Sequence, residues 1–155
     1  MTETFHDSDW TDQEVGFAFG RGVPIISVRM GKDPYGFIGK FQALSCSWDT
    51  APLEIVKIFI KYDQMLNSYI KAVKNCFTYD QGNKLAEVLP HIDNLSDRQI
   101  NMLISAFNEN GQVRDSCGFG GEKPHKYGKG LAWHLNRLTG RKYEIADRGQ
   151  LELVS

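Results

Sequence analysis

Residues 8–30 read SDWTDQEVGFAFGRGVPIISVRM, and this stretch decides the fold expected for the first part of the chain. Ser8 or Asp7 can accept hydrogen bonds from the free amides of a first helical turn, whose acidic side chains suit the positive end of the helix dipole. Gly20 and Gly22 are expected to end this helix. The apolar, β-branched segment that follows is typical of a strand covered on both faces of a parallel sheet. The stretch therefore predicts a helix followed by a buried parallel strand over residues 23–30.

Downstream of this strand, helical periodicity dominates the sequence. Residues 35–44 are expected to form a short helix or a helical turn. The small, polar segment 45–50 marks a boundary whose Thr50 can cap the next helix. Apolar residues then recur at steps of three and four over residues 53–77, which predicts one long helix, or two with a bend. This second half of the chain is thus expected to be mainly helical.

The remaining segments follow from caps, periodicity and turn residues. Ser96 and Gln99 match a capping box, in which the hydroxyl and the amide side chain each satisfy a backbone N–H of the first turn. The expected elements are a helix over 83–89, a helix over 96–107, an extended segment over 112–117, a flexible loop over 118–124, a helix over 129–138 ended by Gly140, and a β-hairpin formed by 143–145 and 151–154.

Length and composition place the chain among ordinary globular proteins. Its 155 residues fit one domain or two small ones, and 41% apolar residues exclude global disorder. Eighteen basic against nineteen acidic residues leave a net charge of −1, which argues against a basic coat for duplex DNA. Residues 112–150, with eight basic and four acidic side chains, carry the surplus of positive charge. An anion-binding face is therefore expected only in this tail.

Metal, phosphate and membrane motifs are missing from the sequence. The three cysteines and four histidines are scattered, without metal-ligand spacing, so no metal is expected and the thiols indicate a reduced, cytoplasmic protein. The longest apolar run, over 53–62, is broken by Lys57 and Lys61, so no membrane span is expected. The glycine-rich segment 118–130 fails the P-loop pattern, because Lys129 is followed by glycine instead of Ser or Thr.

The motif S-D-W-T-D-Q-E at residues 8–14, the strand over 23–28 and the segment D-P-Y-G-F-I-G-K-F-Q-A-L at 33–44 resemble the second half of a bacterial TIR (Toll/interleukin-1 receptor) domain. The strand has Ser27 where this family most often has proline. The resemblance implies a flavodoxin-like α/β sheet. The fold class expected is therefore a partial TIR sheet over residues 1–44, followed by a mainly α-helical region over 50–155 with a C-terminal β-hairpin.

The resemblance also implies an activity. Catalytically competent TIR domains cleave the nicotinamide–ribose bond of NAD+, which is a substrate here and not a cofactor, with a glutamate that corresponds to Glu14. Trp10, one helical turn earlier, and Ser8 would bind the substrate in the same site. A fixed carboxylate stabilises the positive charge that develops on the ribose. Without the resemblance, Trp10 would be expected in the core and Glu14 would be expected to be solvated.

A complete TIR domain has further strands before the motif, and only seven residues precede Ser8. The chain is therefore expected to be the C-terminal part of a longer protein, or to borrow strands from a partner, and to show little NAD+ hydrolysis as it stands. The family implies a hydrolase in signal transduction and bacterial anti-phage immunity that acts as a homo-oligomer through TIR–TIR contacts.

Two other function classes remain open. A non-catalytic module could self-associate through the TIR-like segment and the helix over 53–77. The order helix, helix, hairpin over 96–154 is that of a winged-helix nucleic-acid binder, with Arg137, Arg141 and Lys142 as basic side chains. The roughly twenty residues between those helices are far more than a helix-turn-helix allows, so nucleic-acid binding of that type is not expected.

Overall fold

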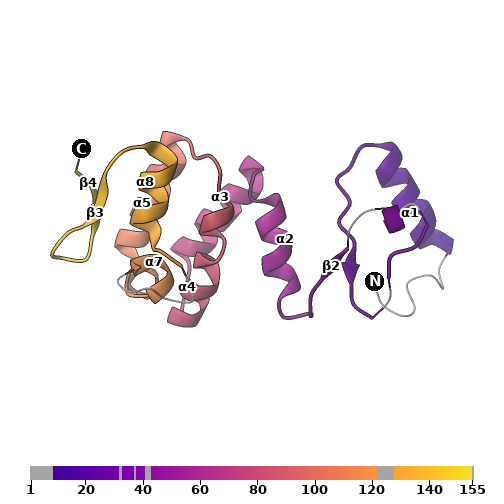
Figure 1. Cartoon of the computed structure of the whole chain (residues 1–155), viewed down its shortest axis with the longest axis horizontal. Helices are drawn as coiled ribbons and strands as arrows, with labels where there is room; N and C mark the ends of the chain where they lie inside the picture. The colour runs from indigo at the N-terminus through magenta and orange to yellow at the C-terminus, as the bar shows by residue number, and fades with distance from the viewer. Residues whose placement is uncertain (1–8, 32, 37, 41–42, 122–127, 155) are drawn as a thin grey trace. The chain divides into compact units, whose positions relative to one another are not determined.

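The computed structural model describes residues 9–31, 33–36, 38–40, 43–121 and 128–154, with the side chains of residues 9–11 and 40 left out (Figure 1). The described chain is mainly helical and forms two compact units, Met1–Ile55 and Val56–Ser155. No described helix is both long and apolar enough to cross a membrane.

The first unit contains a helix and a small parallel sheet. Helix α1 (Asp9–Gly20) ends at the predicted glycine, and Gly22 follows in a left-handed conformation with φ +67°. Strand β1 (Val28–Arg29) pairs in parallel with β2 (Leu44–Ser45). The backbone N–H of Leu44 donates to the carbonyl of Ser27 over 2.9 Å, which extends the contact by one residue.

Two predictions for this unit are met only in part. The strand expected over 23–30 is regular only at β1. Of the short helix or helical turn expected over 35–44, the structure has the turn, the 3₁₀ turn η2 (Ile38–Lys40), and the segment ends in β2. Gly36 adopts a left-handed conformation with φ +58°, which is incompatible with a helix starting there. Pairing with β1, a contact distant in sequence, then draws the end of this segment into a strand.

The helix predicted over 53–77 takes the bent alternative. Helix α2 (Ala51–Phe59) and helix α3 (Asp63–Lys74) are separated by a turn in which Tyr62 is extended, with φ −91° and ψ 131°. The hydroxyl of Thr50 accepts from the N–H of Ser47 over 3.1 Å and so stabilises the turn before α2.

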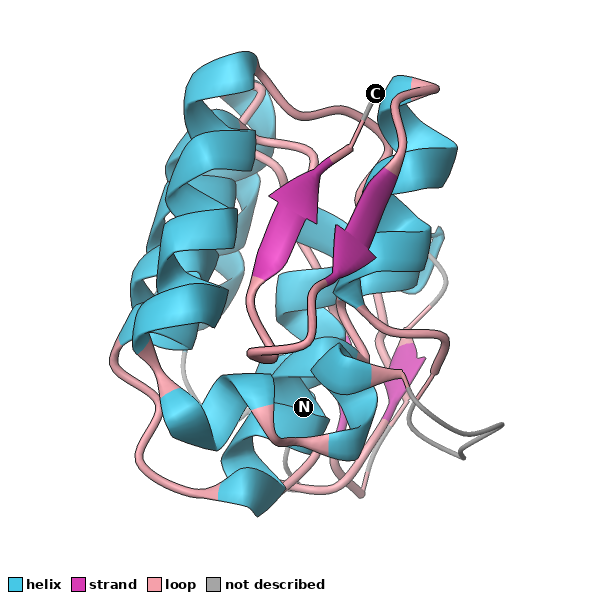
Figure 2. Ribbon diagram, turned by 90° about the vertical axis from the view of Figure 1, so that its left-hand side faces the viewer, coloured by secondary structure: helices cyan, strands magenta, loops and turns pink. Residues whose placement is uncertain are grey.

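The second unit packs helices and one pair of strands around a common core. After α3 come α4 (Tyr79–Ala86), η3 (Leu89–His91), α5 (Asp97–Glu109), α6 (Gly111–Arg114), α7 (Cys117–Gly120), α8 (Leu131–Thr139), β3 (Tyr143–Ile145) and β4 (Leu151–Leu153). Helix α3 packs on α5, and α4 packs on α7. Strands β3 and β4 pair antiparallel and contact α8 and α5, respectively (Figure 2). The largest fully buried side chains of the unit include Phe107, Phe119, Leu103, Leu131 and Leu135.

Caps set the helix boundaries in this unit. The capping box of Ser96 and Gln99 is confirmed at the start of α5. Helix α4 begins earlier than predicted, because the hydroxyl of Thr78 accepts from the N–H of Gln81 over 3.1 Å.

The extended segment expected over 112–117 is wrong, and the flexible loop expected over 118–124 is wrong at residues 118–120, which belong to α7. Residues 122–124 of that loop lie outside the described residues. The side chain of Asn110 caps α6, and the side chain of Ser116 caps α7. Each cap satisfies an amide of a first turn, so two short helices replace extended chain. Phe119, within the second of them, is fully buried.

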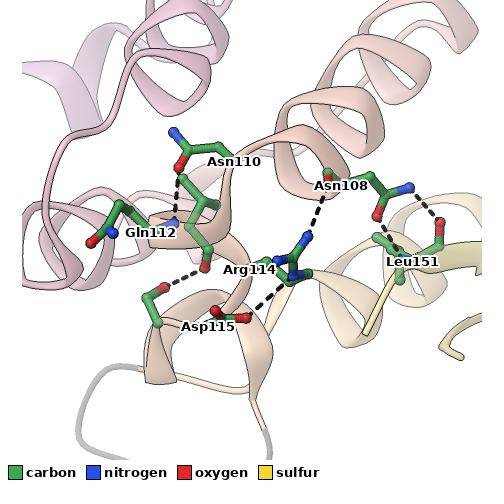
Figure 3. A network of polar contacts seen from close by, with 8 residues as sticks. Asn108, Asn110, Gln112, Arg114, Asp115 and Leu151 are labelled. Atoms are coloured by element: carbon green, nitrogen blue, oxygen red, sulfur yellow. Dashed lines mark hydrogen bonds and ion pairs between the residues drawn. The ribbon is translucent and has the colours of Figure 1, made fainter. Parts of the chain in front are cut away.

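Asn110 joins three segments of the second unit. Its Nδ2 donates to the carbonyls of Lys74 and Cys76 over 3.0 and 2.9 Å and, more weakly, to that of Val73 over 3.4 Å. Its Oδ1 accepts from the N–H of Gln112 over 2.9 Å (Figure 3). One side chain therefore closes the end of α3 and opens α6.

Asn108 connects α5 to strand β4. Its side chain exchanges two hydrogen bonds with the backbone of Leu151, of 3.1 and 2.7 Å, and its carbonyl accepts from Nη1 of Arg114 over 3.1 Å (Figure 3). This pair of bonds anchors β4 to the end of α5.

Two glycines meet directly in the second unit. Gly121 has φ +65°, and a Cβ atom placed on it would lie 2.5 Å from the carbonyl oxygen of Lys129 and 2.7 Å from Cα of Gly130. Gly130 has φ +82°, and its own Cβ would lie 2.8 Å from Cα of Gly121. The backbones before α8 and after α7 approach so closely that no side chain fits between them.

Candidate functional site

The predicted catalytic residue, Glu14, lies on α1 and is exposed to solvent. Positions 10 and 14 are one turn apart and share a face of this helix. The side chain of Trp10 and the whole of Ser8 lie outside the described residues. Within the part of the chain that is described, no hydrogen bond or ion pair holds the Glu14 carboxylate.

The loop after β1 reaches back to α1 through a tyrosine that sequence reasoning did not assign to the site. The hydroxyl of Tyr35 donates to Oδ1 of Asp12 over 2.9 Å. Asp12 precedes Glu14 by two residues, which places the two positions on nearly opposite sides of the helix. The Tyr35–Asp12 bond therefore ties this loop to a side of α1 other than the one that bears Glu14. The spacing of acidic residues along α1 was visible in the sequence, but the partner of Asp12 was not.

The segment next to β1 carries a buried polar group. Ser27 is 5% exposed, and no described residue is a hydrogen-bond partner for its hydroxyl. Two residues on, Arg29 forms an ion pair with Asp33 over 2.6 Å. The ion pair spans the start of the loop that presents Tyr35.

The chemistry available at Glu14 follows from its exposure. In water a carboxylate attracts a cation 4 Å away by only about 1 kcal/mol, whereas the same pair shielded from water interacts several times more strongly. Glu14 could therefore stabilise a cationic ribose strongly only if further protein groups shielded the pair from water. No group of three or more His, Cys, Asp or Glu side chains suited to a metal ion occurs among the described residues.

A second cluster, absent from the sequence-based prediction of the site, is formed by Trp133 and Arg137 of α8 and by Lys129, which lies two residues before this helix. The Nζ of Lys129 lies 4.2 Å from the ring centroid of Trp133, and the guanidinium carbon of Arg137 lies 5.9 Å from it. Trp133 is nevertheless 41% exposed. The spacing of four residues on each side of the tryptophan is the signal in the sequence that could have revealed the cluster.

His134, next to this tryptophan, is buried. It is 4% exposed, its ring meets that of Trp133 edge-on with centroids 4.9 Å apart, and no described residue is a partner for its Nδ1. Desolvation, followed by the charges of Arg137 and Lys129, lowers the pKa of His134 from 6.5 to about 4. The imidazole is therefore neutral at pH 7.

This pKa predicts a loss of stability in acid. Because the unfolded chain binds the proton near pH 6.5 and the folded chain only near pH 4, stability is complete above pH 6.5 and falls as the pH drops toward 4. The loss is on the order of 3 kcal/mol. Urea unfolding of wild type and His134→Gln at pH 7 and pH 4 measures it, and the variant should lose less. His91→Gln, at an exposed position, is the matched control and should behave as wild type. Equal pH dependence in wild type and His134→Gln would contradict the prediction.

Comparisons of the chain with protein-family models, curated proteins and solved structures found no match.

Proposed function

We propose that residues 1–44 belong to a TIR-type NAD+-cleaving module with Glu14 as its catalytic carboxylate and Trp10 and Ser8 at the substrate. The observation that carries the proposal is an exposed carboxylate on α1, one turn after a tryptophan, in a helix that precedes a parallel strand. The resemblance of residues 8–44 to bacterial TIR domains supports it. The proposal extends to a cytoplasmic signalling protein in anti-phage defence that works as a homo-oligomer.

The proposed reaction breaks the bond between the ribose C1′ and the nicotinamide nitrogen. The bonding electron pair leaves with nicotinamide, which becomes neutral, and the ribose acquires oxocarbenium character. A water oxygen then bonds to C1′ and loses its proton, which gives ADP-ribose. The negative charge of Glu14 stabilises the cationic ribose, and an aromatic wall one turn away holds the substrate in place.

The test is the rate of NAD+ loss, measured for the 155-residue chain and for the chain joined to any in-frame coding sequence upstream of Met1. We expect little hydrolysis by the 155-residue chain and clear hydrolysis by the extended protein. Glu14→Ala should lower the extended protein's rate by about 100-fold or more, as loss of one preorganised electrostatic group does in other active sites. Glu14→Gln, which keeps the shape but not the charge, should be nearly as inactive.

The matched control is Glu152→Ala, which removes an exposed carboxylate from β4 and should leave the rate unchanged. Hydrolysis that persists unchanged in Glu14→Ala would remove Glu14 from the mechanism. Rapid turnover by the isolated 155-residue chain would refute the expectation that this chain needs completion.

A second candidate, a non-catalytic self-association module, is favoured by the apolar surface of α1 and the residues after it. Phe17 is 69% exposed, Phe19 51% and Val23 52%. Exposed apolar side chains gathered in one segment are typical of contact surfaces. Sedimentation of wild type and Phe17→Glu separates the candidates: an oligomer that Phe17→Glu dissociates, in an extended protein without NAD+ loss, favours this function.

A further inference from the structure

The exposed side of α8, together with the residues just before it, combines two cations with one exposed aromatic ring. Lys129 and Arg137 each lie four residues from Trp133 and within cation–π distance of its ring, at 4.2 and 5.9 Å. These contacts hold the long basic side chains near one point of the surface. Arg137 is fixed further by a hydrogen bond from its Nη2 to the carbonyl of Ile92 over 3.1 Å. We call Lys129, Trp133 and Arg137 the α8 face.

The α8 face carries positive charge that no carboxylate in the described ranges neutralises. Arg141 pairs with Asp97 over 3.0 Å, and Lys142 pairs with Glu144 over 2.7 Å, so the nearby acidic residues at these positions are already engaged. Neither Lys129 nor Arg137 forms an ion pair with a carboxylate in the described ranges. The two cations therefore remain available to an anionic ligand.

Trp133 narrows the chemistry of that ligand. An acidic peptide would need the two cations but would gain little from an indole that is 41% exposed. A duplex hides its bases inside a stack and offers only grooves and phosphates. Single-stranded nucleic acid supplies both phosphates and free base faces, and the sequence-tolerant way to bind it is a basic surface with an aromatic stacking platform.

We propose that the α8 face binds single-stranded nucleic acid: a base displaces the Lys129 ammonium from above the Trp133 ring and stacks there, and Lys129 and Arg137 then contact backbone phosphates. This site is separate from the one built around Glu14, and it is not the winged-helix mode considered from the sequence, which would place a helix in a duplex groove. It requires no activity toward NAD+.

The experiment titrates the whole 155-residue chain into a fluorescein-labelled 12-nucleotide oligothymidylate at low salt and follows anisotropy. We expect saturable binding that Trp133→Leu weakens at least about fivefold, the effect of losing one base–aromatic stack. The matched control is Trp48→Leu, which removes a tryptophan that is 73% exposed in the first unit and should bind as wild type. Urea midpoints confirm that both variants are folded.

Salt dependence tests the cations independently. Each of Lys129→Gln and Arg137→Gln should flatten the plot of log affinity against log salt by about 0.7, the contribution of one phosphate contact on a single strand. Lys71→Gln, which removes an exposed lysine of α3, should not change the slope. Arg137 also donates a hydrogen bond to the carbonyl of Ile92, so Arg137→Gln could destabilise the fold. In that case the result for Lys129→Gln decides.

Three outcomes would overturn the proposal. The first is no anisotropy change at the lowest salt. The second is competition by poly-glutamate as effective as that by oligothymidylate, with Trp133→Leu unchanged, which identifies an acidic-peptide surface. The third is competition by AMP as effective per nucleotide as the oligomer, which identifies a mononucleotide site. Trp133→Leu should leave NAD+ loss by the extended protein unchanged, so failure here does not bear on Glu14.

Discussion

Gly121→Ala is expected to lower the free energy of unfolding of the helical unit by about 3–5 kcal/mol, whereas Gly140→Ala should cost only about 1–2 kcal/mol. The two glycines have nearly the same backbone conformation, with φ and ψ of 65° and 19° at Gly121 and of 68° and 2° at Gly140. A new Cβ meets nothing within 4 Å at Gly140, but at Gly121 it lies 2.5 Å from the carbonyl oxygen of Lys129. The difference between the two variants therefore isolates the packing of one backbone against another.

Urea unfolding followed by far-UV circular dichroism measures both variants, because most of the helical signal comes from Val56–Ser155. The denaturant dependence should stay constant, so that the midpoints report stability. Equal losses for Gly121→Ala and Gly140→Ala would show that the close approach of Gly121 and Gly130 relaxes without cost.

Asn110→Ala is the second substitution for which we expect a large loss, of about 3 kcal/mol. It removes the cap of α6, worth about 1 kcal/mol, and leaves the carbonyls of Lys74 and Cys76 without this donor. The Cys76 carbonyl is partly buried and adds a penalty of about 1–3 kcal/mol, whereas the exposed Lys74 carbonyl can bond to water. The control is Asn101→Ala at an exposed position of α5, where alanine favours the helix and stability should be unchanged or slightly higher.

Asn110→Asp separates the two roles of this side chain. Aspartate keeps the oxygen that accepts from Gln112 but loses the Nδ2 donor and places a negative charge beside the carbonyls. If the donor contributes most, Asn110→Asp should be as unstable as Asn110→Ala in urea unfolding. A stability near wild type for Asn110→Asp would show instead that the cap alone matters.

The sequence predicted those helices whose limits are set by neighbouring residues. The capping box of Ser96 and Gln99, the end of α1 at Gly20 and the end of α8 before Gly140 all depend on contacts within one or two turns. Residues 111–120 were missed because their caps, Asn110 and Ser116, open helices of a single turn with too few apolar residues to show a period. Strand β2 was missed because its partner is distant in sequence. In addition, the apolar residues of the segment 35–44, in which it begins, have helical spacing.

Prediction of the site was limited in the same way. The pattern of residues 8–14 places Glu14 on α1, and the structure adds that this position is exposed. The hydrogen bond between Tyr35 and Asp12 joins residues 23 apart, and no local rule connects them. The α8 face was accessible from the sequence through its regular spacing, but only the distances reveal that both cations converge on one ring.

The contact between Gly121 and Gly130 also bears on how such a chain can change in evolution. The two glycines hold the two ends of the segment between them together. The length of that segment can therefore change without changing this contact. Doubling the length of a closed segment costs only about 0.6 kcal/mol of closure entropy. We therefore expect the chain to tolerate residues inserted between Gly121 and Gly130 much better than a side chain at either glycine.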